Sequence, residues 1–328
     1  MPNDDDATIR LPRPGTVPAA AMATPAPLPP GRRFGLWLGL GAGALTLCGG
    51  GAAWWFLASP PATLITEQPA DLTPVTAPRI VPPPLLDAQA IVSHRAAVPT
   101  VWRWAANPLV WVLDFPSLEL QGLGMNRIAA LVEKGRTPRD RVLDDDALAA
   151  AIAADRRTTA SWYFGHNYRA SDVLRMFELA ARDGIRLNPQ ERWVEEQLRL
   201  ALQVDRGRDS AILTIPGIGP QVDENLRRTI LLHELGHGQF FTLPFFAAHV
   251  MRVWETGFSE TERADVRRFL RSDGYDTAQE EMMANEAMAY LLYTPDRRFF
   301  DPARDLGWSD AQADRLRALL RAGAPEQP

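Results

Sequence analysis

The sequence contains almost no cysteine and almost no lysine. Cys48 is the only cysteine among 328 residues, which excludes an intrachain disulfide and any zinc cluster built from several thiolates. Lys134 is the only lysine, so arginine supplies nearly all of the positive charge. Because the net charge is −5, the chain lacks the basic balance typical of proteins that bind nucleic acid, and we expect no nucleic-acid partner.

Charged residues are also absent from one long run, residues 34–58. About 20 apolar residues form a helix that spans a bilayer, and tryptophans stand near both ends of this run. Arg32 and Arg33 precede the run, and the next basic residue is Arg79. The positive-inside rule therefore predicts a single-pass protein of the bacterial inner membrane, with its N-terminus in the cytoplasm and its bulk in the periplasm.

Three glycines in this run, Gly35, Gly39 and Gly43, are spaced by four. Small residues at this spacing allow two membrane helices to pack closely, so a homodimer through this face is one prediction. The alternative is that glycine is simply frequent in the run. A cleaved signal peptide is the rival interpretation of the whole segment, but Pro60 and Pro61 stand where cleavage would fall.

Two segments rich in proline flank the apolar run, one on each side. Residues 1–33 hold eight prolines and few aromatics, which predicts a disordered cytoplasmic tail. Residues 59–84 hold eight more and predict an extended linker. Residues 85–328 then form the folded domain.

The pattern from residue 85 onward is mainly helical, and it includes an aromatic-rich stretch at Val101–Trp111. One clear strand, Ala211–Ile215, indicates a small sheet, so the predicted class is mainly α with a small β-sheet (α+β). Cap residues and apolar spacing predict helices over residues 125–134, 144–156, 190–202, 223–241, 259–271, 277–293 and 310–321. Residues 85–205 match no functional module that we can assign.

The helix predicted over residues 223–241 carries the sequence His233-Glu234-Leu235-Gly236-His237. Residues i and i+4 lie on one face of a helix, so both imidazoles can reach one metal ion. Glu234 projects from a neighbouring direction, where it can act on a water molecule bound to that ion. The motif predicts two zinc ligands and a base, and a catalytic zinc site needs a third protein ligand.

The third ligand is not a histidine six residues further on, because that position is Leu243. Three glutamates on the predicted helix 277–293 are candidates: Glu280, Glu281 and Glu286. Methionines and alanine flank Glu286 at helical spacing, so it lies on a buried-looking face, where a carboxylate is costly unless it meets a cation. The other two lie nearer the helix N-terminus, where solvated acids are favourable. Glu280 and Glu281 stay open as alternatives.

The sequence Asn285-Glu286-Ala287, after His-Glu-x-x-His, resembles the gluzincin metallopeptidases. The resemblance covers roughly residues 211–293. It implies a zincin-like catalytic domain with bound Zn²⁺, Glu286 as the third ligand, and hydrolysis of peptide bonds. Tyr290 stands four residues after Glu286, where that clan often has an aspartate; it can hydrogen-bond a developing oxyanion or simply pack.

The expected reaction uses Glu234 as general base on a zinc-bound water. Ala211–Ile215 is expected to be an edge strand that pairs with an extended substrate, and Phe240, Phe241, Phe245 and Phe246 to line an apolar pocket or to belong to the core. The substrate is a peptide or protein of the cell envelope, including a peptidoglycan peptide. The alternative is a catalytically silent, metal-binding scaffold that binds a protein partner.

The sequence gives less reason to expect a functional role for the other three histidines. His94 is expected to be exposed, and His249 to belong to a core or an interface. His166 lies in an aromatic stretch, where a paired structural histidine is more common than a substrate-binding one.

Overall fold

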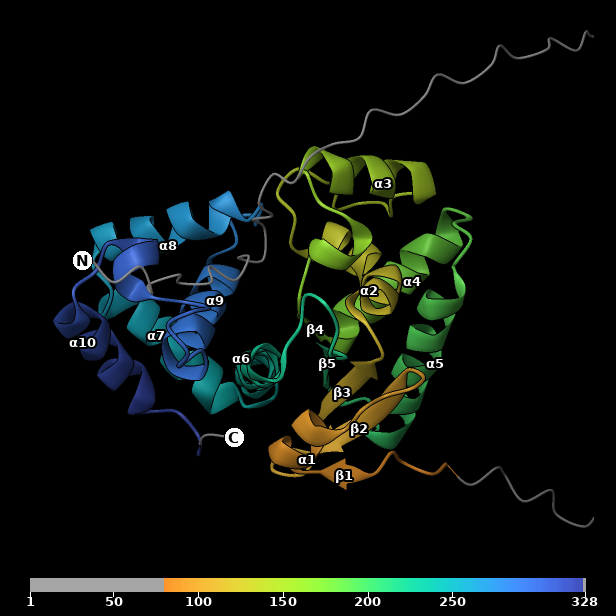
Figure 1. The fold of residues 1–328 in the computed structure, drawn as a ribbon, viewed down its shortest axis with the longest axis horizontal. Helices are drawn as coiled ribbons and strands as arrows, with labels where there is room; N and C mark the ends of the chain where they lie inside the picture. Colours follow the sequence, from red (N-terminus) through yellow and green to blue (C-terminus); the bar gives the residue numbers. More distant parts are fainter. Residues whose placement is uncertain (1–79, 327–328) are drawn as a thin grey trace, which may run out of the picture. The chain divides into compact units, whose positions relative to one another are not determined.

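A five-stranded mixed sheet and a set of α-helices make up residues 80–326, the part of the chain that the computed structural model describes (Figure 1). The strands are β1 (Leu85–Leu86), β2 (Thr100–Trp104), β3 (Val110–Phe115), β4 (His166–Arg169) and β5 (Ala211–Pro216). The helices are α1 (Ala88–Ser93), α2 (Leu118–Val132), α3 (Asp145–Ala154), α4 (Ala170–Arg182), α5 (Pro189–Val204), α6 (Glu224–Thr242), α7 (Pro244–Thr256), α8 (Glu260–Ser272), α9 (Glu280–Tyr293) and α10 (Asp310–Arg321), with short helical segments η1 (Thr159–Ser161) and η2 (Pro302–Leu306). The prediction of a mainly helical domain with a small sheet is confirmed.

The aromatic stretch Val101–Trp111 forms strands, so the helical pattern predicted there is wrong. Strands β2 and β3 pair antiparallel around a turn at Asn107, whose backbone N–H donates to the carbonyl oxygen of Trp104 over 3.1 Å. Valine and tryptophan are frequent in both strands, whose sequences are TVWRW and VWVLDF. β-branched and aromatic side chains fit the pleated surface of a sheet better than a helix, which explains the outcome.

The strand predicted at Ala211–Ile215 is present as β5, but its predicted place at the edge is wrong. The strand order is β1-β2-β3-β5-β4, so β5 lies between β3, to which it is parallel, and β4, to which it is antiparallel. All six residues of β5 are buried, as expected for a central strand. The edge next to α6 belongs to β4 instead.

Side-chain caps fix where several helices begin. The carboxylate of Asp223 accepts a hydrogen bond from the backbone N–H of Leu226 over 2.7 Å and starts α6. Ser259 and Glu262 form a capping box at the start of α8, as the sequence predicts. Helix α2 begins at Leu118 rather than at residue 125, because Ser117 caps it.

Helix α6 lies between the sheet and the C-terminal helices (Figure 1). Leu231 and Leu235 on one face pack against Val110 and Leu213 of the sheet. On another face α6 approaches α9 so closely that a Cβ atom added at Gly236 would lie 2.5 Å from the ring of Tyr293. The glycine inside His-Glu-Leu-Gly-His therefore sets the distance between the two helices.

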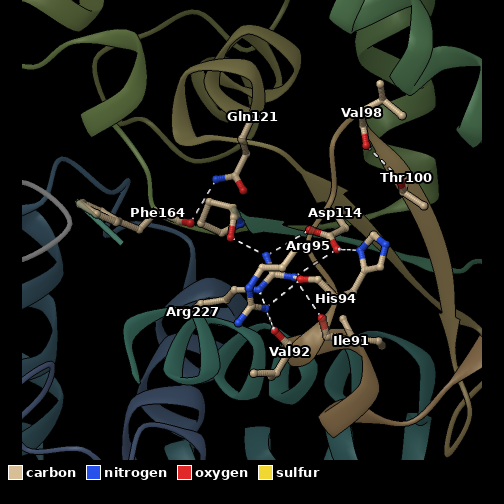
Figure 2. Close-up of polar contacts among 11 residues, drawn as sticks. Ile91, Val92, His94, Arg95, Val98, Thr100, Asp114, Gln121, Phe164 and Arg227 are labelled. Atoms are coloured by element: carbon tan, nitrogen blue, oxygen red, sulfur yellow. Dashed lines mark hydrogen bonds and ion pairs between the residues drawn. The ribbon is translucent and has the colours of Figure 1, made fainter. Parts of the chain in front are cut away.

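A buried arginine anchors the N-terminal half of α6 (Figure 2). Arg227 is fully buried, and its guanidinium donates to both carboxylate oxygens of Asp114 on β3, at 3.1 Å each. It also donates to backbone carbonyl oxygens in and next to α1 and at the end of β5, which belong to Ile91, Val92, His94 and Pro216. Since every donor direction is satisfied, the charge is buried without an unpaired group. The contacts fix α6 against the sheet six residues before His233.

The predicted tail (1–33), membrane-spanning run (34–58) and most of the linker (59–84) lie outside the described residues, as do Gly35, Gly39 and Gly43. Within residues 80–326, no helix combines the length and the apolarity needed to cross a membrane.

Candidate metal centre

Helix α6 presents both histidines of the motif on one face. The Nε2 atoms of His233 and His237 lie 3.1 Å apart, and the two rings meet edge to face with centroids 4.7 Å apart. His237 is fully buried, and the side chain of His233 is 15% exposed. The i, i+4 spacing therefore aims two imidazole nitrogens at one point, as the sequence predicts.

Helix α9 brings the carboxylate of Glu286 to the same point. Its Oε2 atom lies 3.7 Å from Nε2 of His233 and 3.8 Å from Nε2 of His237. Ligand atoms about 2.0–2.2 Å from a zinc ion at tetrahedral angles lie about 3.3–3.6 Å from one another. The three observed separations, 3.1, 3.7 and 3.8 Å, lie within about 0.2 Å of this range, so the three atoms are close to the spacing of ligands around one zinc ion.

The chemistry of these three groups also fits a cation. Burial lowers the pKa of both His233 and His237 to about 4, so the imidazoles are neutral at pH 7 and cannot neutralise a carboxylate. Burial raises the pKa of Glu286, and nearby His237 opposes this shift. The Oε2 atom of Glu286 is buried and has no hydrogen-bond partner among the described residues. The hydroxyl of Tyr275 also lowers the pKa of Glu286 through a hydrogen bond, so only Oε2 lacks a partner. A buried carboxylate oxygen without a partner, beside two neutral imidazoles, is costly unless a cation joins them.

A threonine sets the tautomer of the first histidine. The Oγ1 atom of Thr294, just after α9, lies 2.8 Å from Nδ1 of His233 and 3.1 Å from the carbonyl oxygen of Ala289. A carbonyl oxygen can only accept, so the hydroxyl proton goes to Ala289 and the hydroxyl must accept from His233. Nδ1 of His233 therefore carries the proton, and the lone pair on Nε2 faces the ligand cluster.

Two residues of the β4 region hold the carboxylate of Glu234. The side-chain amide of Asn167 donates to Oε2 of Glu234 over 3.0 Å. Gly165 leaves room for the other oxygen, because a Cβ atom there would lie 2.0 Å from Oε1. Burial raises the pKa of Glu234 well above its ordinary value, while the hydrogen bond from Asn167 lowers it. The result is a fixed, basic carboxylate directly beside His233.

No protein-family model, curated protein or solved structure matches the chain. The interpretation of the site therefore depends on its own residues and their geometry.

The other two candidate ligands on α9 lie elsewhere. Glu280 accepts hydrogen bonds from Trp254 over 2.8 Å and from Arg267 over 2.6 Å. Glu281 forms an ion pair with Arg169 at 2.5 Å. Both carboxylates have partners of their own, and neither belongs to the cluster of candidate ligand atoms.

Tyr290 lies beside the cluster. Its ring centroid is 4.8 Å from that of His233, and its side chain lines the same cavity as His233 and Glu234. This position is compatible with the predicted role as a hydrogen-bond donor, and it also packs against Phe269 and Phe300.

The remaining histidines lie outside the candidate metal centre. His94 is half-buried rather than exposed, because its Nδ1 atom lies 2.7 Å from the carboxylate of Asp114. His166 is buried in β4, with Nδ1 3.0 Å from the hydroxyl of Tyr168. His249 is half-buried and contacts the carbonyl oxygen of Leu319 on α10 over 2.9 Å.

The phenylalanines after the motif divide between three environments. Phe240 and Phe246 belong to the core and are almost completely buried, whereas Phe245 is 94% exposed. Phe241 alone among these four lines a cavity beside the site. The predicted apolar pocket made by all four is wrong, since the bend at Pro244 turns their side chains in different directions.

Two cavities border the candidate ligands. The histidine pocket, of about 80 Å³, is lined by 14 residues that include His233, Glu234 and Tyr290. The glutamate pocket, of about 270 Å³, is lined by 12 residues that include Glu286 and Arg169. His233 lines only the first pocket, and Glu286 lines only the second.

Four residues of the site were missed in the sequence: Glu133, Gly165, Asn167 and Thr294. Glu133 and Asn167 line both pockets. Each lies far from the motif along the chain, so no spacing could connect it to the histidines. The aromatic stretch around His166 did draw attention to this segment of the sequence. However, its neighbours Gly165 and Asn167 contact Glu234, and His166 does not belong to the candidate metal centre.

Proposed function

We propose that residues 85–328 form a gluzincin-type zinc peptidase domain that hydrolyses peptide bonds. The observation that carries the proposal is the convergence of His233 Nε2, His237 Nε2 and Glu286 Oε2 beside a fixed Glu234 carboxylate. The histidines and Glu286 would hold the ion. When bound, zinc would lower the pKa of water and polarise the scissile carbonyl.

Glu234 supplies the base in this proposal. Its carboxylate is buried, its orientation is fixed by Asn167, and burial makes it more basic than an exposed glutamate. A carboxylate with a raised pKa accepts a proton from water more readily and then donates it to the leaving amine. Tyr290, whose ring centroid lies 4.8 Å from that of His233, would donate a hydrogen bond to the developing oxyanion.

Strand β4 offers a place for the substrate backbone. Ala170 donates its N–H to the carbonyl oxygen of Ser210, so the antiparallel register leaves the backbone groups of Asn167 and Arg169 directed toward the open edge. Residues of the segment 163–169 line both the histidine pocket and the glutamate pocket. An extended peptide that adds to β4 would therefore run from one pocket to the other, past the candidate ligands.

The wider setting remains a prediction from the sequence. A periplasm-facing domain anchored by residues 34–58 in the inner membrane would act on peptides or proteins of the cell envelope.

The test is peptidase activity of the purified full-length chain with zinc, on a mixed peptide library, for wild type and Glu234→Gln. A general base contributes about 10²–10⁴-fold, so the variant should lose at least about 100-fold while it keeps its zinc. Glu119→Gln, an exposed glutamate on α2, is the matched control. Bound zinc without any activity, and no difference between wild type and Glu234→Gln, would favour the scaffold alternative.

A further inference from the structure

A third buried carboxylate, that of Glu133, lies at the boundary between the two pockets. Its side chain lines both the histidine pocket and the glutamate pocket. The residue is 4% exposed and sits at the C-terminal end of α2. Its backbone N–H donates to Ala129 over 2.9 Å, and its carbonyl oxygen accepts from Asp276 over 2.8 Å. Both backbone groups of Glu133 are therefore held by hydrogen bonds, which fix the place from which its side chain starts.

The nearest basic side chains are engaged elsewhere. The ammonium of Lys134 lies over the rings of Trp162 and Tyr163, at 4.8 and 4.6 Å from their centroids. It also donates to the carbonyl oxygen of Asp273 over 3.0 Å. Arg139 forms its ion pair with Asp276 at 3.1 Å. Neither forms an ion pair with Glu133 among the described contacts, so the two cations act on it only at longer range.

The carboxylate of Glu133 is also incompletely hydrogen-bonded. Its Oε2 atom and the hydroxyl of Tyr163 are both buried, and neither has a hydrogen-bond partner of good geometry within residues 80–326. Burial, and then the charge of Glu286, raise the pKa of Glu133 to about 8, while the nearby hydroxyl of Tyr163 and the charges of Lys134 and Arg139 lower it. A buried acid of this kind is costly to keep in a folded protein, and a cation that enters the pocket would relieve the cost.

We propose that Glu133 binds a primary ammonium group of the substrate. This inference rests on the proposed peptidase function. It restricts the proposed substrates to peptides that carry a free primary ammonium group. Glu133 shares the histidine pocket with Glu234 and the glutamate pocket with Glu286, so a bound ammonium would lie in a cavity that borders the proposed metal centre. Two sources supply this chemistry: the α-ammonium at the N-terminus of a peptide, or the side-chain ammonium of a diamino acid.

Direct binding tests the proposal without requiring hydrolysis. The probes are phenylalaninamide, which has a free α-ammonium, N-acetylphenylalaninamide, which has none, and Nα-acetyllysinamide, which has only a side-chain ammonium. Binding to the full-length zinc-loaded chain is measured by calorimetry at pH 7. At least one ammonium probe should bind about tenfold or more tightly than N-acetylphenylalaninamide, because a buried charge pair is lost without the ammonium. The probe that binds more tightly identifies the source.

The variant Glu133→Gln keeps the shape of the side chain and removes its charge. It should abolish the preference for the ammonium probe, whereas Glu119→Gln, an exposed glutamate on the same helix, should keep it. Equal binding of all three probes to wild type, or an unchanged preference in Glu133→Gln, would overturn the proposal. The Glu234→Gln variant should keep the preference even where it abolishes turnover, so a failed peptidase and a failed ammonium site give different results.

Discussion

The hydroxyl oxygen of Thr294 lies 2.8 Å from Nδ1 of His233 and accepts a hydrogen bond from it. This contact leaves the lone pair on Nε2 of His233 directed at the same point as Nε2 of His237 and Oε2 of Glu286. A hydrogen bond to the distal nitrogen of a metal-binding histidine fixes the tautomer and the orientation of the ring. Thr294 is therefore a positioning residue in the proposed metal centre, although it is 57 residues away from the motif.

Replacing Thr294 with valine keeps the shape of the side chain but removes the acceptor. Loss of such a contact typically weakens metal binding by about 10–100-fold, so we expect Thr294→Val to weaken zinc binding by this factor. Thr294→Ser keeps the hydroxyl and should stay close to wild type. Competition with a chromogenic chelator measures both constants. Equal zinc affinity in the valine and serine variants would show that the contact does not set the tautomer.

Alanine at position 165 should disable the base without removing the metal. A Cβ atom there would lie 2.0 Å from Oε1 of Glu234 and 3.0 Å from the side chain of Ile230, so the carboxylate must move. We expect Gly165→Ala to lower kcat by about 100-fold or more, since a misplaced base loses most of its effect, and to retain zinc. Gly219→Ala, where no atom lies within 4 Å of the added Cβ, is the control. Full activity in Gly165→Ala would contradict the assigned role of Glu234.

Alanine substitutions of the three glutamates of α9, Glu280, Glu281 and Glu286, should differ in their effect on zinc binding. Glu286→Ala removes one of three proposed ligands and should weaken zinc binding by several orders of magnitude. Glu280→Ala and Glu281→Ala remove carboxylates bound to Arg267 and Arg169, and zinc binding should stay near wild type. Metal content after dialysis distinguishes the three. Retained zinc in Glu286→Ala, together with loss in either other variant, would reassign the third ligand.

The stability of the metal-free chain should depend on Glu133 in a defined pH window. Burial raises the pKa of Glu133 from 4.5 to about 8, so between these values the folded chain holds a proton that the unfolded chain releases. This contribution to the free energy of unfolding therefore falls as pH rises, by at most about 1.4 kcal/mol per pH unit. Glu133→Gln cannot release a proton, and its stability relative to wild type should increase from pH 5 to pH 8.

Urea unfolding of the metal-free protein at pH 5, 6.5 and 8 measures this difference. Glu119→Gln is again the matched control, since that side chain is exposed. Parallel pH profiles for wild type and Glu133→Gln would contradict a raised pKa at this position.

Sequence signals that act within one helical turn were sufficient to predict several of the C-terminal helices. The apolar spacing and the caps at Asp223, Ser259 and Ser309 predicted α6, α8 and α10 to within a residue or two, because these signals act within one helical turn. The i, i+4 spacing also predicted that His233 and His237 share a face. Glu286 could be chosen over its neighbours because its helical face is apolar.

Long-range contacts could not be predicted in this way. The position of β4 at the edge depends on which strands pair, and four residues at His166–Arg169 carry too little pattern to show it. The same limit applies to Asn167 and Glu133, which join the site through tertiary packing alone. In the aromatic stretch Val101–Trp111, cross-strand pairing decided the conformation, and a single sequence does not display its partner strand.

The central claim is that one zinc ion binds between α6 and α9. Elemental analysis by mass spectrometry of the purified full-length chain, after dialysis against a weak chelator, tests it most directly. We expect about one zinc per chain in wild type, and a loss of zinc in His237→Ala but not in His249→Ala. Absence of zinc in the folded wild-type protein, or equal zinc in His237→Ala and wild type, would contradict it.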